Sequence, residues 1–139
     1  MKQKSKKKAT DARSNTEFAS LVMIASRLRR DCPWDRVQTL EKFCSFIENE
    51  SDEMMQAVRN NDIANLQEEL GDVFFNILMV CAIAQEKQHF TLAQVLTDVR
   101  EKIVRRHPHV YCNEKAATPR DVERIWKRVK DEEKRRNKK

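Results

Sequence analysis

The fold of this chain is constrained most by a helical pattern that breaks once, at the polar residues 60–62. Apolar residues recur at spacings of three and four on both sides of the break, which indicates two amphipathic helices joined by a short turn. Each helix carries a pair of acids three positions apart, Glu50 with Glu53 and Glu69 with Asp72. Residues three apart share one face of a helix. A hairpin of the two helices would therefore bring all four carboxylates together.

The four acids lie on the apolar side of their helices. Phe46 and Ile47 precede Glu50 by one turn, and the later helix is almost wholly apolar over Val73–Ala84, which is typical of a helix buried nearly all round. Carboxylates that face a core repel one another unless a cation lies among them, and Mg²⁺ prefers such oxygen ligands. Alternatively the acid pairs are solvated helix faces, because 36% of all residues are charged.

The single glycine of the chain, Gly71, lies between Glu69 and Asp72. Glycine inside a helix costs about 1 kcal/mol relative to alanine. We therefore expect another backbone or a ligand to approach the helix closely at this point.

Composition and charge predict an all-α fold in one domain. One glycine and three prolines in 139 residues leave little turn material for a β-protein, and strong helix formers are abundant. Residues 1–13 carry six bases and one acid, and residues 127–139 carry eight bases and three acids, whereas the body between them is acidic. We expect a disordered basic tail over 1–13, the domain over 14–135 and a second basic tail over 136–139.

From the sequence we expect neither a membrane protein nor a secreted one. No apolar run reaches the roughly 17–20 residues that span a bilayer, and the basic N-terminus lacks the apolar segment of a secretory signal. The four cysteines show no C-x-x-C spacing, so we expect reduced thiols in a cytoplasmic protein. Nucleic-acid binding by the basic ends stays an alternative, although these ends form no patch interleaved with aromatic residues.

Apolar spacing and capping residues predict five helices, over about 14–30, 39–60, 63–88, 91–106 and from 118 onward. Trp34 falls between the first two, where it is either a hydrophobic plug or a surface for a flat ligand. Lys102 and Arg106 share one face near a helix C-terminus, so they either complement the helix dipole or reach one phosphate chain. On the last helix, Trp126 lies one turn before Lys130 and is either core or a platform for a base.

Five motifs occur in one order: C-P-W-D (32–35), E-x-x-E (50–53), E-E-L-G-D (68–72), R-R-H-P-H-V-Y (105–111) and W-x-x-x-K (126–130). In this order they resemble the MazG family of nucleoside triphosphate pyrophosphohydrolases, over roughly residues 18–135. The resemblance implies an all-α helical bundle that is completed by assembly into a homodimer or a higher homo-oligomer. A helix that is apolar all round is compatible with this, because a partner subunit would share its burial.

The resemblance also implies a Mg²⁺ site, with Mn²⁺ as a substitute, whose ligands are Glu50, Glu53, Glu69 and Asp72. The first glutamate of the family's E-E-x-x-E motif corresponds to Asn49, whose amide cannot act as a carboxylate base.

In related members, residues matching Lys102 and Arg106 contact the triphosphate, and residues matching Trp126 and Lys130 hold the nucleotide; Trp34 is a further candidate for substrate binding. The implied reaction is hydrolysis of a ribo- or deoxynucleoside triphosphate to its monophosphate and pyrophosphate, as in the cleaning of nucleotide pools. Glu53 would act as the general base, with Lys102 and Arg106 stabilising charge on the leaving group. The alternative is a catalytically weakened nucleotide-binding or regulatory protein, in which Asn49 is the residue that weakens catalysis.

Overall fold

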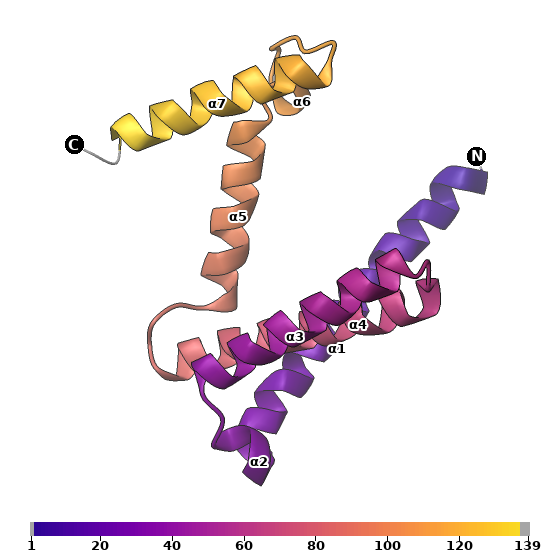
Figure 1. Ribbon diagram of the computed structural model, residues 1–139, viewed down its shortest axis with the longest axis vertical. Helices are drawn as coiled ribbons and strands as arrows, with labels where there is room; N and C mark the ends of the chain where they lie inside the picture. Colours follow the sequence, from indigo (N-terminus) through magenta and orange to yellow (C-terminus); the bar gives the residue numbers. More distant parts are fainter. Residues whose placement is uncertain (1, 137–139) are drawn as a thin grey trace. The chain divides into compact units, whose positions relative to one another are not determined.

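The computed structural model describes the backbone of residues 2–136 and the side chains of residues 12–136. Its described part is helical and contains no strand, which confirms the all-α prediction (Figure 1). The helices are α1 (Lys2–Asp31), α2 (Pro33–Arg36), α3 (Leu40–Arg59), α4 (Ile63–Glu86), α5 (Leu92–Arg106), α6 (Pro108–Tyr111) and α7 (Pro119–Arg136). They form two compact units, Met1–Leu92 and Ala93–Lys139. None of the described helices is both long and apolar enough to cross a membrane.

Helices α3 and α4 form the predicted hairpin and lie side by side in Figure 1. Thr39 caps α3 by accepting a hydrogen bond from the Lys42 amide at 3.2 Å, and Asp62 caps α4 by accepting one from the Asn65 amide at 3.1 Å. Between them Asn61 has a φ of 53°, in the left-handed region that asparagine tolerates better than most residues. The polar break is therefore a tight turn, and it sets the two acid-bearing helices against each other.

The core of the first unit is built from α1, α3 and α4. Its most buried members are Ala25 of α1, Phe43 of α3, and Leu78, Met79 and Ile83 of α4. Burial of these side chains supplies the main stabilising term that keeps the hairpin on α1.

A buried arginine joins α1 to the residues that follow it. Arg29 is 8% exposed and bonds both carboxylate oxygens of Glu86 at the end of α4, at 2.9 and 2.6 Å. It also donates to the backbone oxygens of Asp35 and, at 3.2 Å, Gln38. Because its charge is paired and it donates four hydrogen bonds, the buried guanidinium can hold α2 and the segment before α3 in place.

Three stretches are more helical than the sequence predicts. The segment expected as a disordered tail over 1–13 is helical from residue 2, where α1 begins. Lysine, glutamine and alanine favour helix, and no glycine or proline interrupts this segment. Single-turn helices begin at Pro33 and Pro108, where proline occupies the first helical position. Of the tail predicted over 136–139, Arg136 is the last residue of α7, and residues 137–139 lie outside the described residues.

Over residues 78–84 helix α4 is buried or half-buried on every side, as its sequence predicts, but one side of the helix is open before this stretch. Leu70, Phe74 and Ile77 are 44%, 52% and 39% exposed. The first two border a groove whose other wall includes Phe18 and Leu21 of α1. The difference arises because α1 and α3 cover only part of the circumference of α4.

Gly71 also lines this groove. A Cβ atom placed on it would meet no atom within 4 Å beyond its own helix. The predicted close approach at Gly71 is therefore not made by any described part of this chain.

Candidate metal centre

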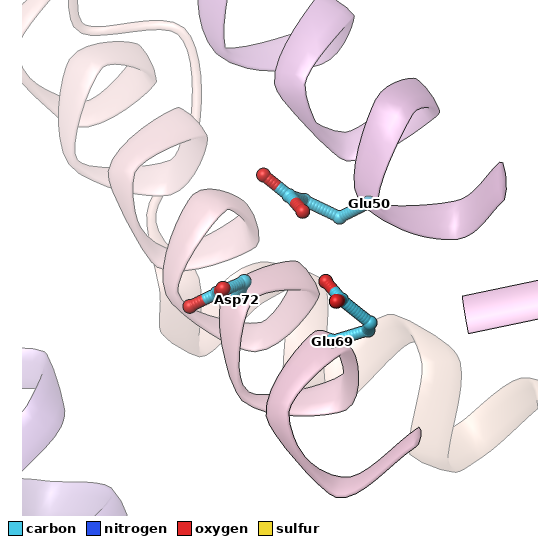
Figure 2. Close-up of side chains that lie close together, drawn as sticks. All are labelled: Glu50, Glu69 and Asp72. Atoms are coloured by element: carbon cyan, nitrogen blue, oxygen red, sulfur yellow. The ribbon is translucent and has the colours of Figure 1, made fainter. Parts of the chain in front are cut away.

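Three of the four predicted acidic ligands meet between α3 and α4. Glu50 projects from α3, and Glu69 and Asp72 project from α4, so that one carboxylate oxygen of each lies within 4.8 Å of the others. Figure 2 shows the three carboxylates gathered on the facing sides of the two helices. The spacing of three residues placed Glu69 and Asp72 on one face, and the turn at residues 60–62 brought that face to Glu50.

Glu69 is the buried member of this cluster, with only 6% of its surface exposed. Loss of hydration raises the pKa of its carboxyl group, and the negative charge of Glu53 raises that pKa further. A hydrogen bond with Glu50 and the charges of Glu50 and Asp72 act in the same direction. The cluster is therefore electrostatically strained when all of its carboxylates are ionised.

Glu53 lies close enough to influence Glu69 but is not part of the tight trio. Its side chain is exposed one turn after Glu50 on α3. Its charge is the second cause of the raised pKa of Glu69. Asn49, which replaces the first glutamate of the motif, is also exposed.

The donor set of the cluster suits a hard divalent cation. None of the ion pairs among the described residues joins Glu50, Glu53, Glu69 or Asp72 to a lysine or arginine. Carboxylate oxygens from facing helices, with no cationic side chain to neutralise them, are ligands that Mg²⁺ or Mn²⁺ can share. The residues present therefore fit such an ion.

An aromatic surface lies one helical turn from the acids. The indole of Trp34 is 54% exposed, so it is not a hydrophobic plug. It stacks on the ring of Phe46, with centroids 6.2 Å apart and planes inclined by 20°. Phe46 precedes Glu50 by four residues on α3. Sequence reasoning assigned Phe46 only to the apolar side of its helix, and nothing in its spacing indicates that it supports Trp34.

The remaining predicted site residues belong to the second unit. Lys102 is exposed and lies one turn before Arg106 on α5, while Lys130 is exposed on α7. Arg106 is bound to Glu133, which sequence reasoning did not single out. Trp126 is 37% exposed, and its ring meets that of His107 edge to face at 5.3 Å.

Comparison with known proteins identifies relatives of the chain. The model of the MazG nucleotide pyrophosphohydrolase domain matches residues 38–111. The nucleoside triphosphate pyrophosphohydrolase of Escherichia coli K12 is 33% identical over 116 residues, which are 81% of this chain and 44% of that protein. The nucleoside triphosphate pyrophosphohydrolase/pyrophosphatase MazG of Thermotoga maritima is 34% identical over 119 residues, 84% of this chain and 45% of that protein.

The uncharacterized protein YabN of Bacillus subtilis is 35% identical over 120 residues, which are 85% of this chain and 24% of that protein. The chain thus spans between a quarter and a half of the length of these curated relatives.

A solved structure and the family match agree on the fold. The crystal structure of a mazG-related protein from Thermotoga maritima superposes with a TM-score of 0.74 at 36% identity, covering 81% of this chain and 98% of that one. The residues matched by the family model include α3 and α4 with all four predicted acids, and they make up more than half of the chain. The chain belongs to the MazG nucleotide pyrophosphohydrolase family.

Proposed function

We propose that this protein hydrolyses ribo- or deoxynucleoside triphosphates to the monophosphate and pyrophosphate, in a Mg²⁺-dependent reaction that clears unwanted nucleotides from the cytoplasmic pool. The observation that carries the proposal is the convergence of Glu50, Glu69 and Asp72 without a neutralising cationic side chain. In this arrangement Glu69 loses hydration and the acids repel one another, which a divalent cation would offset. Family membership supplies the reaction class.

The roles of the acids would follow from how exposed each side chain is. Glu50, Glu69 and Asp72 would hold the metal, while Glu53, exposed on the next turn of α3, would accept a proton from the attacking water. The bound ion would neutralise phosphate charge and lower the pKa of a water molecule. The water oxygen would bond to the α-phosphorus as the bond from that phosphorus to the bridging oxygen breaks, and pyrophosphate would leave.

Basic and aromatic side chains would bind the rest of the substrate. Lys102 and Arg106 would neutralise the charge that develops on the departing pyrophosphate. Trp126 and Lys130 would hold the nucleotide. Trp34 would offer the exposed face of its indole to the base, because its other face rests on Phe46.

Asn49 favours a second candidate function, in which the site binds nucleotides without turning them over. An amide at this position offers a carbonyl oxygen to a metal but no negative charge. Against this candidate, Asn49 is exposed and the trio of acids beside it is intact, and both observations favour the enzyme.

The test of the proposed function is product identification. The protein is incubated with a panel of ribo- and deoxynucleoside triphosphates, in Mg²⁺ and in EDTA, and the products are separated by ion-exchange chromatography. We expect monophosphate and pyrophosphate in Mg²⁺ only. Diphosphate with inorganic phosphate would contradict the proposed reaction, and nucleotide binding without products would favour the regulatory alternative.

A second copy of the chain is the proposed occupant of the open side of α4. Leu70, Phe74 and Ile77 form an apolar strip there, and α1 adds the apolar side chains of Phe18 and Leu21. Gly71 leaves the backbone of α4 uncovered in this strip, which suits the close approach of another helix. A homodimer or larger homo-oligomer would bury all of these groups.

Phe74→Glu is expected to reduce the protein to monomers, because the assembly would have to bury an unpaired carboxylate against apolar groups. Light scattering coupled to size-exclusion chromatography measures the mass of wild type and variant. Val37→Glu is the matched control, because Val37 is 70% exposed and lies outside the groove. A monomeric wild type, or a Phe74→Glu protein of wild-type mass, would contradict the assembly.

A further inference from the structure

In the second unit, the carboxylate of Glu133 on α7 joins two arginines of α5. Its Oε1 accepts a hydrogen bond from Arg105 Nε at 2.7 Å. Its Oε2 accepts from Nε and Nη2 of Arg106 at 3.2 and 2.8 Å. The hydrogen bonds from both arginines lower the pKa of Glu133 to about 2, so the carboxylate is ionised at neutral pH.

The contact occupies only one edge of the Arg106 guanidinium. Nε and Nη2 lie on the edge that faces Glu133. A guanidinium has five N–H donors in a rigid plane, so three remain, including both on Nη1. Among the described residues no acceptor is bound to Nη1. Arg106 is thus held along one side and can offer the opposite side to an anion.

We propose that Glu133 is a positioning residue that fixes Arg106 for contact with the phosphates of the substrate. The inference rests on the proposed function, which assigns Arg106 to the triphosphate. An arginine side chain loses rotamer freedom when it binds, and a carboxylate that already holds the guanidinium removes much of that loss in advance.

Retention of the pair during binding is favoured over its displacement. The side chains of Glu133 and Arg106 are only 18% and 28% exposed. A phosphate that displaced Glu133 from Arg106 would remove two of the three hydrogen bonds of a largely buried carboxylate and leave only the one from Arg105, which is unfavourable. A phosphate on the free edge of Arg106 leaves the pair intact.

The test compares Glu133→Gln with Glu132→Gln in the full-length protein. Glutamine keeps the shape of glutamate, but its amide can accept a bond from one arginine only and turns an N–H toward the other. Glu132 is the adjacent residue on α7 and bonds Arg128 at 3.3 Å, away from Arg106. Because both variants lose one negative charge, they change the general attraction of anions equally.

We expect the KM for the triphosphate to rise about tenfold in Glu133→Gln relative to Glu132→Gln, with kcat changed much less, because a contact that binds the ground state and the transition state alike is weakened. Affinity for pyrophosphate, measured by calorimetry, should fall by a similar factor. Glu133→Asp, which restores the carboxylate, should recover part of both losses. In a double-mutant cycle Glu133→Gln should add nothing to Arg106→Gln, since Glu133 acts through Arg106.

Equal KM and pyrophosphate affinity in Glu133→Gln and Glu132→Gln would overturn the inference while leaving the proposed function standing. Tighter binding in Glu133→Gln would identify Glu133 as a competitor of the phosphate instead. Circular dichroism establishes that each variant is folded. A wild type that turns over no triphosphate would contradict the proposed function. The pyrophosphate titration alone would then decide the role of Glu133. Absence of pyrophosphate binding by the wild type would overturn both.

Discussion

Glu69→Gln is expected to lower metal-dependent nucleotide hydrolysis by at least about 100-fold without loss of the helical fold. Glu69 is the buried acid of the trio; it faces Glu50 across the hairpin and lies three positions before Asp72 on α4. Glutamine has the same shape but carries no charge, so the cluster would offer one carboxylate fewer to the ion. Initial rates of pyrophosphate release measure the effect.

The stability of this variant distinguishes a damaged site from a damaged fold. In wild type, burial and neighbouring charges raise the pKa of Glu69, which means that the ionised form is disfavoured in the folded protein. Removing that charge should leave the metal-free protein as stable as wild type or more so. Glu68→Gln is the matched control, because Glu68 is exposed on the same turn and its replacement changes the net charge equally. Equal activity of the two variants would remove Glu69 from the site.

Phe43→Ala is expected to lower the free energy of unfolding by about 3–5 kcal/mol, the usual cost of deleting a large buried aromatic ring. Phe43 is 1% exposed, packs in the core of the first unit, and meets the ring of Phe46 edge to face at 5.6 Å. Its loss would open a cavity beneath α3, the helix that carries Glu50. Urea denaturation followed by circular dichroism, at one protein concentration, measures the change.

The matched control for Phe43→Ala is Val58→Ala on the same helix. Val58 is 52% exposed, so its truncation should change the free energy of unfolding by less than about 0.5 kcal/mol. If Phe43→Ala cost no more than Val58→Ala, the first unit would not be held together by the core described above.

The helical hairpin could be predicted from the sequence because its determinants are local. The caps at Thr39 and Asp62, the turn around Asn61 and the apolar spacing all act within a few residues. The same spacing indicated which face of each helix carries the acids. It could not fix distances across the hairpin, so Glu53 was expected beside Glu50 in a four-ligand set, whereas only three acids form the tight cluster.

The sequence pattern could not predict contacts between residues that lie far apart in the chain. The partners Arg29 and Glu86 are 57 positions apart, and Arg106 and Glu133 are 27 apart. On a single helix each of these residues resembles an ordinary solvated charge, and only tertiary packing pairs it. The single turns at Pro33 and Pro108 were missed for another reason, since four residues are too few to display helical periodicity.

Direct measurement of metal binding tests the central claim, that the acidic cluster is a divalent metal centre. Mn²⁺ is titrated into wild type, Glu69→Gln and Glu68→Gln, and the free ion is followed by electron paramagnetic resonance, with no turnover required. We expect saturable binding in wild type and in Glu68→Gln, and much weaker binding in Glu69→Gln. Equal binding by wild type and Glu69→Gln, or no saturable binding by the wild type, would contradict a metal centre formed by Glu50, Glu69 and Asp72.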